Sequence, residues 1–307
     1  MDYWYNALLF CASIPYVVIV LLTLFANAAA HSKTIVRLAM ELWSNNTCID
    51  FHENRTAPNR VGIAVHEIAH ALAFFHEQSR YDRDDSITVS GWESQVSKQT
   101  RATNDNLGLP ISSNGKPSML AKITQYQDTM GSEILSFRDA KEMNLYYGCT
   151  SNCASHTNFC QNGGILRPRN CSTCICPSGY GGTTCNTRPP GCGSTVVATA
   201  ELKSLILEVG SNFGMQDMYT FCNWRIEAPI GKKIVASITA YAKNVCYEGC
   251  PYGGIEMKWR NDMTLTGSRY CCPDDVGQNV TTSTNVLPII GFSRYGRESA
   301  TISYKYV

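Results

Sequence analysis

"HEIAHALAFFHEQSR", residues 66–80, holds three of the six histidines of the chain within eleven positions. In a helix, His66 and His70 lie one turn apart on the same face, where two imidazole nitrogens can bind one metal ion. Glu67 lies beside them, near enough to take a proton from a metal-bound water. His76 follows His70 by six residues, so the helix must end near residue 72 and the chain must turn back for a third imidazole to reach the ion.

This set of side chains has the composition of a catalytic zinc centre. Three histidines leave the fourth position of a tetrahedral Zn²⁺ site open for water. Zinc lowers the pKa of that water to about 7, and a carboxylate such as that of Glu67 accepts the released proton. The alternative is an amphipathic helix with surface histidines. The third histidine, followed by "EQSRYDRD", favours the metal centre.

These residues resemble the astacin family of zinc endopeptidases, whose signature reads H-E-x-x-H-x-x-G-F-x-H-E with an Arg and an Asp-Arg pair just beyond. "AMELWSNNTCIDF" (39–51) resembles the first helix of that family and the strand after it, and residues 126–149 resemble the end of its catalytic domain. The resemblance implies that His66, His70 and His76 bind Zn²⁺ and that Glu67 is the general base. It also implies endoproteolysis of protein substrates, a Cys48–Cys149 disulfide, and a Glu77 that binds the buried N-terminus of an activated enzyme.

The sequence departs from the family pattern at three places. Ala73 stands where the family has glycine, which costs ~1–2 kcal/mol in a left-handed turn and is small beside the roughly 10–16 kcal/mol of structural zinc binding. Between the segments that match residues 54–60 and 61–67, the family has further strands and a second disulfide. This chain has neither. The Met-turn, Ser-x-Met-x-Tyr, has no counterpart between 104–110 and 111–117. Loss of its tyrosine removes an oxyanion donor and costs ~10²–10³ in rate.

The predicted fold is multidomain. Residues 33–149 form an α+β metzincin-like catalytic domain with internal deletions, residues 150–191 a small disulfide-rich module, and residues 192–307 an all-β sandwich. Within the first, "TIVRLAMELW" (34–43) predicts a helix with Ser32 as N-cap. Its predicted apolar face consists of Ile35, Leu38, Ala39 and Leu42.

Six cysteines in residues 150–191 resemble an EGF-like module, through the ending "CICPSGYGGTTC". Sequence alone leaves 15 pairings open. The family pairing, first with third, second with fourth and fifth with sixth, implies the bonds Cys153–Cys171, Cys160–Cys174 and Cys176–Cys185. The module is predicted to be a spacer whose fold is held together by its disulfides.

Residues 192–307 alternate apolar and polar side chains at 234–240, 255–259 and 302–306, which predicts an antiparallel sandwich. "CG" at Cys192, "FCNWRI" around Cys222 and "CPYGGIEMKW" before "TGSRYCC" resemble a CUB domain. That resemblance implies a Cys192–Cys222 bond and two more among Cys246, Cys250, Cys271 and Cys272. The arrangement resembles nematode-type astacins, and the CUB domain is expected to bind a protein or matrix ligand.

Fourteen cysteines from Cys48 to Cys272 can all pair, which indicates an oxidising compartment and a secreted protein. Asn-x-Ser/Thr sequons agree with this; they begin at Asn45, Asn54, Asn170 and Asn279. Residues 1–30 are predicted to be a signal peptide cleaved after Ala28 or Ala30; a membrane anchor is the alternative. The net charge of +1 and the lack of a basic run exclude a nucleic-acid role.

Two functions follow from these residues. The first is a secreted zinc metalloendopeptidase acting on extracellular proteins. The second is a catalytically impaired astacin-like protein that acts in binding or adhesion through its EGF-CUB region.

Overall fold

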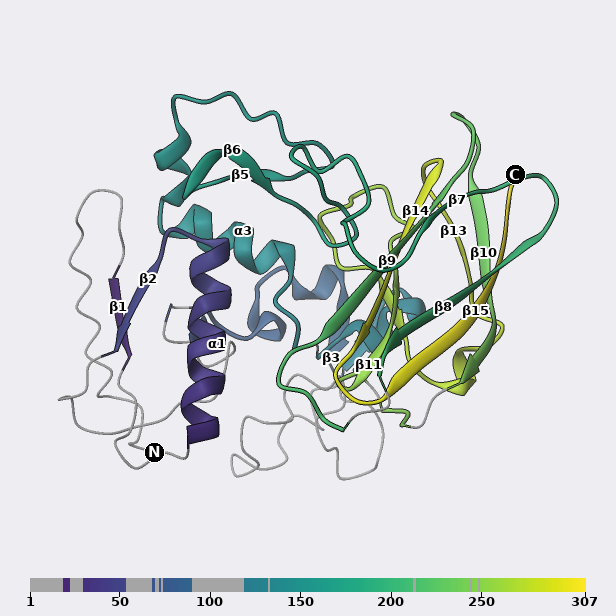
Figure 1. Cartoon of the computed structure of the whole chain (residues 1–307), viewed down its shortest axis with the longest axis horizontal. Helices are drawn as coiled ribbons and strands as arrows, with labels where there is room; N and C mark the ends of the chain where they lie inside the picture. The colour runs from purple at the N-terminus through teal and green to yellow at the C-terminus, as the bar shows by residue number, and fades with distance from the viewer. Residues whose placement is uncertain are drawn as a thin grey trace. The chain divides into compact units, whose positions relative to one another are not determined.

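The computed structural model describes residues 19–22, 30–53, 68–69, 72, 74–89, 119–131, 133–211, 214–242, 245–247 and 249–307. These residues form two compact units (Figure 1). The first takes its described residues from the ranges Met1–Ser79, Leu135–Cys160 and Gly164–Ile175. The second takes them from Arg80–Ile134, Gln161–Gly163 and Cys176–Val307. The domain boundaries inferred from the sequence remain predictions.

Among its described residues, the first unit has the helices α1 (Ala30–Asn46) and α3 (Phe137–Tyr146). Strands β1 (Ile19–Leu22) and β2 (Asp50–Glu53) pair in parallel, and β5 (Ile165–Arg167) and β6 (Asn170–Ile175) form an antiparallel hairpin. The short 3-10 helices η1 (Glu77–Ser79) and η5 (Cys149–Cys153) also belong to it. In the described part of the chain, no helix is long and apolar enough to cross a membrane.

Helix α1 differs from its prediction in two respects. It begins at Ala30, so Ser32 lies inside the helix and is not its N-cap. Its buried face is formed by Val36, Ala39 and Trp43, at the spacing of one helical face. Trp43 is only 1% exposed, and burying this large ring turns the core-facing side one residue away from the predicted face. Three residues of the predicted face are only half-buried: Ile35, Leu38 and Leu42.

The core of the first unit joins α1 to α3. Trp43 of α1 packs in one cluster with Met143 of α3, and that cluster also holds Ile49, Ile68 and Leu72. Ser136 caps α3 by accepting a hydrogen bond from the backbone N–H of Asp139 at 3.1 Å, while the Asp139 carboxylate accepts one from the N–H of Ser136 at 2.8 Å. The Cys48–Cys149 disulfide closes this core, with the two Cα atoms 5.4 Å apart.

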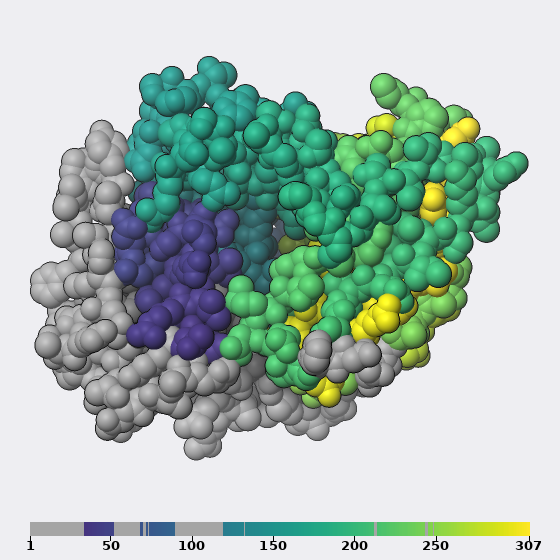
Figure 2. All heavy atoms as spheres, in the orientation of Figure 1, coloured from purple at the N-terminus to yellow at the C-terminus, as the bar shows by residue number. Residues whose placement is uncertain are grey.

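Arg169, which precedes β6, holds the C-terminal end of α1. Its Nε donates to the carbonyls of Ser44 and Thr47 at 2.9 and 3.0 Å. Its Nη2 donates to the carbonyl of Ile49 at 2.8 Å and to Oδ1 of Asp50 at 2.7 Å. In the space-filling view the purple atoms of α1 lie directly against teal atoms (Figure 2). The last turn of α1 has no basic residue of its own, so Arg169 supplies the positive charge that a helix C-terminus favours.

The disulfides of the cysteine-rich segment join the pairs that the resemblance implies. Cys153 bonds to Cys171, Cys160 to Cys174 and Cys176 to Cys185. In the C-terminal part of the chain, Cys192 bonds to Cys222. The two bonds that the sequence left open are Cys246–Cys272 and Cys250–Cys271.

The second unit contains a two-sheet sandwich (Figure 1). One sheet has the order β13 (Asn279–Thr281), β10 (Ile234–Ala242), β15 (Arg297–Tyr306) and β8 (Lys203–Gly210). The other has the order β12 (Ser268–Tyr270), β11 (Gly253–Met257), β14 (Val286–Ser293), β9 (Thr220–Glu227) and β7 (Thr195–Val197). The pairs are antiparallel as predicted, except that β7 runs parallel to β9. Further elements of this unit are η2 (Arg83–Asp85), β3 (Ile87–Val89), β4 (Met119–Ala121), η4 (Thr124–Thr129) and η6 (Pro273–Asp275).

The sandwich core lies between the two sheets. Trp224, Ile289 and Ile302 come from different strands and are each at most 6% exposed. Gly291 faces the Trp224 ring, and a Cβ at this position would lie 2.9 Å from the ring and 3.0 Å from Val209. The absence of a side chain at Gly291 therefore makes room for the tryptophan.

Candidate metal centre

The helical turn of the H-E-x-x-H motif packs on the core of the first unit. Ile68 and Ala69 are helical, and the N–H of Leu72 bonds to the carbonyl of Ile68 at 2.9 Å. Ile68 and Leu72 are 4% and 0% exposed, so this side of the turn is buried. The N–H of Phe74 bonds to the carbonyl of Ala69 at 2.9 Å, which closes the end of the helix. The helix therefore ends where the motif spacing predicts.

His76 follows the helix end in chain without regular secondary structure and is half-buried. Its carbonyl accepts a hydrogen bond from the N–H of Ser79 at 2.9 Å, which forms the turn η1. Glu77, in that turn, is exposed. The motif helix has thus ended before His76, and a 3-10 turn follows this residue.

The stretch after η1 is fixed by an ion pair between Arg80 and Asp82. Arg80 donates from Nε to Oδ1 at 2.8 Å and from Nη2 to Oδ2 at 2.9 Å. This hydrogen bonding lowers the pKa of the Asp82 carboxyl below its ordinary value. The pair gives a physical reason for an arginine and an aspartate two positions apart in the signature.

Three predicted site residues, His66, Glu67 and His70, lie outside the described residues, as does Ala73. Of the predicted zinc ligands the structure therefore places His76. Among the side chains that the structure does describe, no group of three or more histidines, cysteines, aspartates or glutamates is arranged to hold a metal ion.

Helix α3 supports the motif helix through a residue that the sequence did not single out. The Tyr147 hydroxyl donates a hydrogen bond to the carbonyl of Leu72 at 3.2 Å, and this carbonyl lies at the helix end. Tyr147 also packs against the Trp43 and Met143 core. The sequence indicates this role only weakly, because an aromatic residue near the end of a helix is ordinarily assigned to the hydrophobic core.

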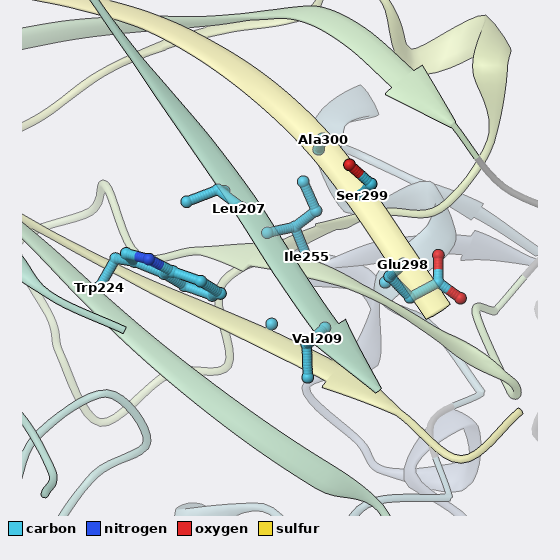
Figure 3. Close-up of a pocket in the computed structure, with 9 residues that line it drawn as sticks. Leu207, Val209, Trp224, Ile255, Glu298, Ser299 and Ala300 are labelled. Carbon is cyan, nitrogen blue, oxygen red and sulfur yellow. The ribbon is translucent and has the colours of Figure 1, made fainter. Parts of the chain in front are cut away.

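A small pocket lies between the sheets of the sandwich (Figure 3). Leu207 and Val209 of β8, Trp224 of β9 and Ile255 of β11 give it an apolar lining, and Glu298 of β15 lies at its margin. The Glu298 carboxylate accepts a hydrogen bond from the Tyr241 hydroxyl at 3.0 Å. The pocket is therefore a gap in the sandwich core, beside a carboxylate that already has a hydrogen-bond partner.

Comparison with known proteins identifies the family. The model "Astacin (Peptidase family M12A)" matches residues 58–148. Zinc metalloproteinase nas-17 of Caenorhabditis elegans is 32% identical over 328 residues, which cover 90% of this chain and 75% of nas-17. Zinc metalloproteinase nas-31 of the same organism is 37% identical over 320 residues, which cover 88% of this chain and 52% of nas-31. The chain belongs to the astacin family of peptidases.

Two further findings describe the extent of the matches. The chain spans about half the length of the first two curated relatives, 52% of nas-31 and 50% of nas-32. Among solved structures, the CUB2 domain of MASP-1 bound to Ca²⁺ matches at 16% identity, with a TM-score of 0.26. That match covers 36% of this chain and 96% of the CUB2 chain.

Proposed function

We propose that the chain is a secreted zinc-dependent metalloendopeptidase that hydrolyses peptide bonds of extracellular proteins. Its membership of the astacin family supports the class of reaction, and the relatives nas-31 and nas-17 are named zinc metalloproteinases. The observation that carries the proposal is the end of the motif helix at residues 72–74, two positions before His76. A helix that ends before His76 is what a third ligand beyond H-E-x-x-H requires.

The donor set His66, His70 and His76 fits zinc, because neutral imidazoles are ordinary Zn²⁺ ligands and three of them leave one position open. The burial of Ile68 and Leu72 agrees with this assignment. On an ideal helix, positions 66 and 70 are about 200° around the axis from positions 68 and 72. The two motif histidines are thus expected on the face directed away from the core, where a substrate can approach.

Glu67 acts as the general base in this proposal. Bound zinc would supply Lewis-acid polarisation of the peptide carbonyl and lower the pKa of water to about 7. Glu67 takes a proton from the attacking water and returns it to the departing amine, so that atoms and charge balance in the hydrolysis.

We further infer that internal family segments, including the Met-turn, are missing from this chain. The alignment with nas-31 runs over 320 residues, although 88% of the 307 residues of this chain is only about 270. About 50 aligned positions of nas-31 therefore face gaps in this chain. Without the Met-turn tyrosine, cleavage is expected to be slower by ~10²–10³ than with that oxyanion donor present.

The remaining regions direct the enzyme. We assign residues 150–191 to an EGF-like spacer, supported by its three disulfides, and residues 192–307 to a CUB domain that binds an extracellular protein or matrix ligand. Seven disulfides in all among the described residues support passage through an oxidising compartment. The sequons of Asn170 and Asn279 lie at exposed positions that a glycosyltransferase can reach.

The test combines metal analysis with cleavage. The purified full chain and its Glu67→Gln variant are analysed for zinc and assayed on casein and a quenched peptide. We expect one zinc per chain in both proteins and a cleavage rate ~10²–10⁴ lower in Glu67→Gln, the range for loss of a general base. Equal residual cleavage by the two proteins, or a correctly folded chain without zinc, would refute the proposal.

A further inference from the structure

Strand β12 is an edge strand of its sheet, yet all three of its residues are buried. Ser268, Arg269 and Tyr270 are 0%, 3% and 2% exposed. An edge strand ordinarily exposes a row of N–H and C=O groups. The helix η4 (Thr124–Thr129) lies against this edge. It is part of residues 119–131 and 133–134, the docking segment, which belongs by sequence to the predicted catalytic region.

We propose that the β11–β12 edge of the sandwich is a binding surface for the docking segment, so that the sandwich and this part of the predicted catalytic region fold as one cooperative unit. Three separate contacts carry the proposal, at Thr129, at Tyr126 and at Glu133.

The first contact supplies hydrogen-bond partners for backbone groups at this edge. Thr129 Oγ1 accepts a hydrogen bond from the N–H of Arg269 at 3.0 Å and donates one to the carbonyl of Gly267 at 3.3 Å. One hydroxyl thus pairs a backbone donor of β12, at Arg269, and the carbonyl of Gly267, the residue directly before this strand. Since Arg269 is buried, loss of the hydroxyl would remove a hydrogen bond to a backbone N–H that water does not readily reach, which is costly.

The second contact is aromatic. The Tyr126 ring lies 6.2 Å from the Trp259 ring at an interplanar angle of 52°, and the Arg260 guanidinium lies over the Tyr126 ring at 6.0 Å. Trp259 is itself held by a hydrogen bond from Nε1 to Ser268 Oγ at 3.0 Å. Burial raises the pKa of Tyr126 to about 12. The half-buried Tyr126 ring therefore packs on the sandwich surface, against Trp259 and Arg260.

The third contact lies at the C-terminal end of the docking segment. Glu133 forms an ion pair with Arg294 at 2.6 Å, and Arg294 also lies over the Tyr219 ring at 5.2 Å. The next residue, Ile134, packs against a cluster that includes Phe292 and the disulfide-bonded Cys250. The segment is thus fixed at its middle and at its end.

The docking segment also shields a buried ion pair at this edge from water. Glu256 of β11 and Arg269 of β12 pair at 3.2 Å, and each side chain is 4% exposed. Glu256 Oε1 also accepts hydrogen bonds from the N–H of Gly267 at 2.8 Å and from the Ser178 hydroxyl at 3.1 Å. Such a pair is favourable only while it is dry and fully hydrogen-bonded. Because η4 lies against β12, departure of the docking segment would admit water to it.

The docking segment is also tied to itself and to the chain that follows. Gln127 accepts a hydrogen bond from the N–H of Ala121 at 3.0 Å and donates one to the carbonyl of Met119 at 3.2 Å. Two residues after Ile134, Ser136 begins the cap of α3. The docking segment therefore ends directly before α3 in the sequence.

The first experiment measures hydrogen exchange by mass spectrometry on the full chain, comparing wild type with Thr129→Val and the matched control Thr124→Val. Thr124 is exposed, in the same 3-10 helix, and its hydroxyl contacts only its neighbour Gln125. We expect exchange to rise about tenfold in peptides covering β12 and the docking segment of Thr129→Val, as the loss of buried hydrogen bonds predicts, and not in the control. Equal rates in all three proteins would overturn the proposal.

The second experiment needs no variant and applies even if Thr129→Val fails to fold. Exchange in wild type is followed at rising urea concentrations. Cooperative folding requires the docking segment and β12 to lose protection at the same urea concentration. Loss of protection in the docking segment while β12 stays protected would show that the edge is stable uncovered, and would refute the proposal. Neither readout depends on peptidase activity.

Discussion

Replacing Arg169 with alanine is expected to loosen the C-terminal end of α1. Its side chain makes four hydrogen bonds there, three to backbone carbonyls and one to the carboxylate of Asp50, at 2.7–3.0 Å. The acceptors carry the partial negative charge of the helix terminus, and two of the carbonyls belong to Thr47 and Ile49, which are almost completely buried. Alanine removes all four hydrogen bonds and the positive charge together.

The magnitude follows from exposure. A hydrogen bond to a charged group contributes about 1.5–3 kcal/mol when buried. The side chains of Arg169 and Asp50 are 38% and 37% exposed, so water replaces part of what is lost. We expect Arg169→Ala to lower the free energy of unfolding of the first unit by about 2 kcal/mol. Arg169→Lys keeps the charge but lacks the planar fork, so its loss is expected to be about half as large.

The assay is urea unfolding of the full chain with its disulfides intact, read by exchange of the amides of residues 47–50. Arg83→Ala is the matched control, because its ion pair with Asp84 at 3.5 Å is exposed and is expected to contribute less than about 0.5 kcal/mol. A loss below about 0.5 kcal/mol for Arg169→Ala, or equal losses for the alanine and lysine variants, would show that Arg169 does not act as the cap of α1.

Three further predictions concern the sandwich. Burial lowers the pKa of Lys258 to about 8 from an ordinary value of 10.5. Between pH 8 and pH 10.5 the unfolded chain therefore binds more protons than the folded chain. The free energy of unfolding should rise with pH over this range, by up to about 3 kcal/mol. Lys258→Met should remove that rise in urea titrations at pH 7.5, 9 and 10; an unchanged rise would contradict the assignment. Gly291→Ala should cost about 1–3 kcal/mol through overpacking against Trp224, read as a lower thermal midpoint, whereas a neutral effect would mean that the core has room. Enzymatic deglycosylation in heavy-oxygen water should convert Asn279 to labelled aspartate, and Asn279→Gln should abolish one glycan; an unlabelled Asn279 would refute glycosylation there.

The features that the sequence predicted well are those with short-range patterns. Strands β10 and β15 lie where apolar and polar residues alternate. The end of the motif helix follows from the six-residue step between His70 and His76. The disulfides predicted from family spacing are those that the structure has, whereas spacing could not decide how Cys246, Cys250, Cys271 and Cys272 pair. Here two cysteines are adjacent, so either could reach each partner.

The sequence failed where distant segments decide the outcome. Arg169 caps a helix more than 100 positions earlier, and no local pattern marks an arginine for such a role. Thr129 completes a strand edge 138–140 positions later, again without a local signal. The face of α1 was predicted one residue off because periodicity alone does not weigh the size of Trp43 against its neighbours. Where His66, Glu67 and His70 lie is still a prediction.

The long separation between the docking segment and its strand has a consequence for biosynthesis. At roughly 5–20 residues per second, a ribosome needs roughly 7–28 s to make the 138 residues that separate Thr129 from Gly267. During that interval the side chains of Tyr126 and Ile134 lack their packing partners in the sandwich. They are then exposed apolar groups, to which chaperones or other copies of the chain can bind. The yield of folded protein should therefore depend on chaperones in the cell as well as on the stability of the folded chain.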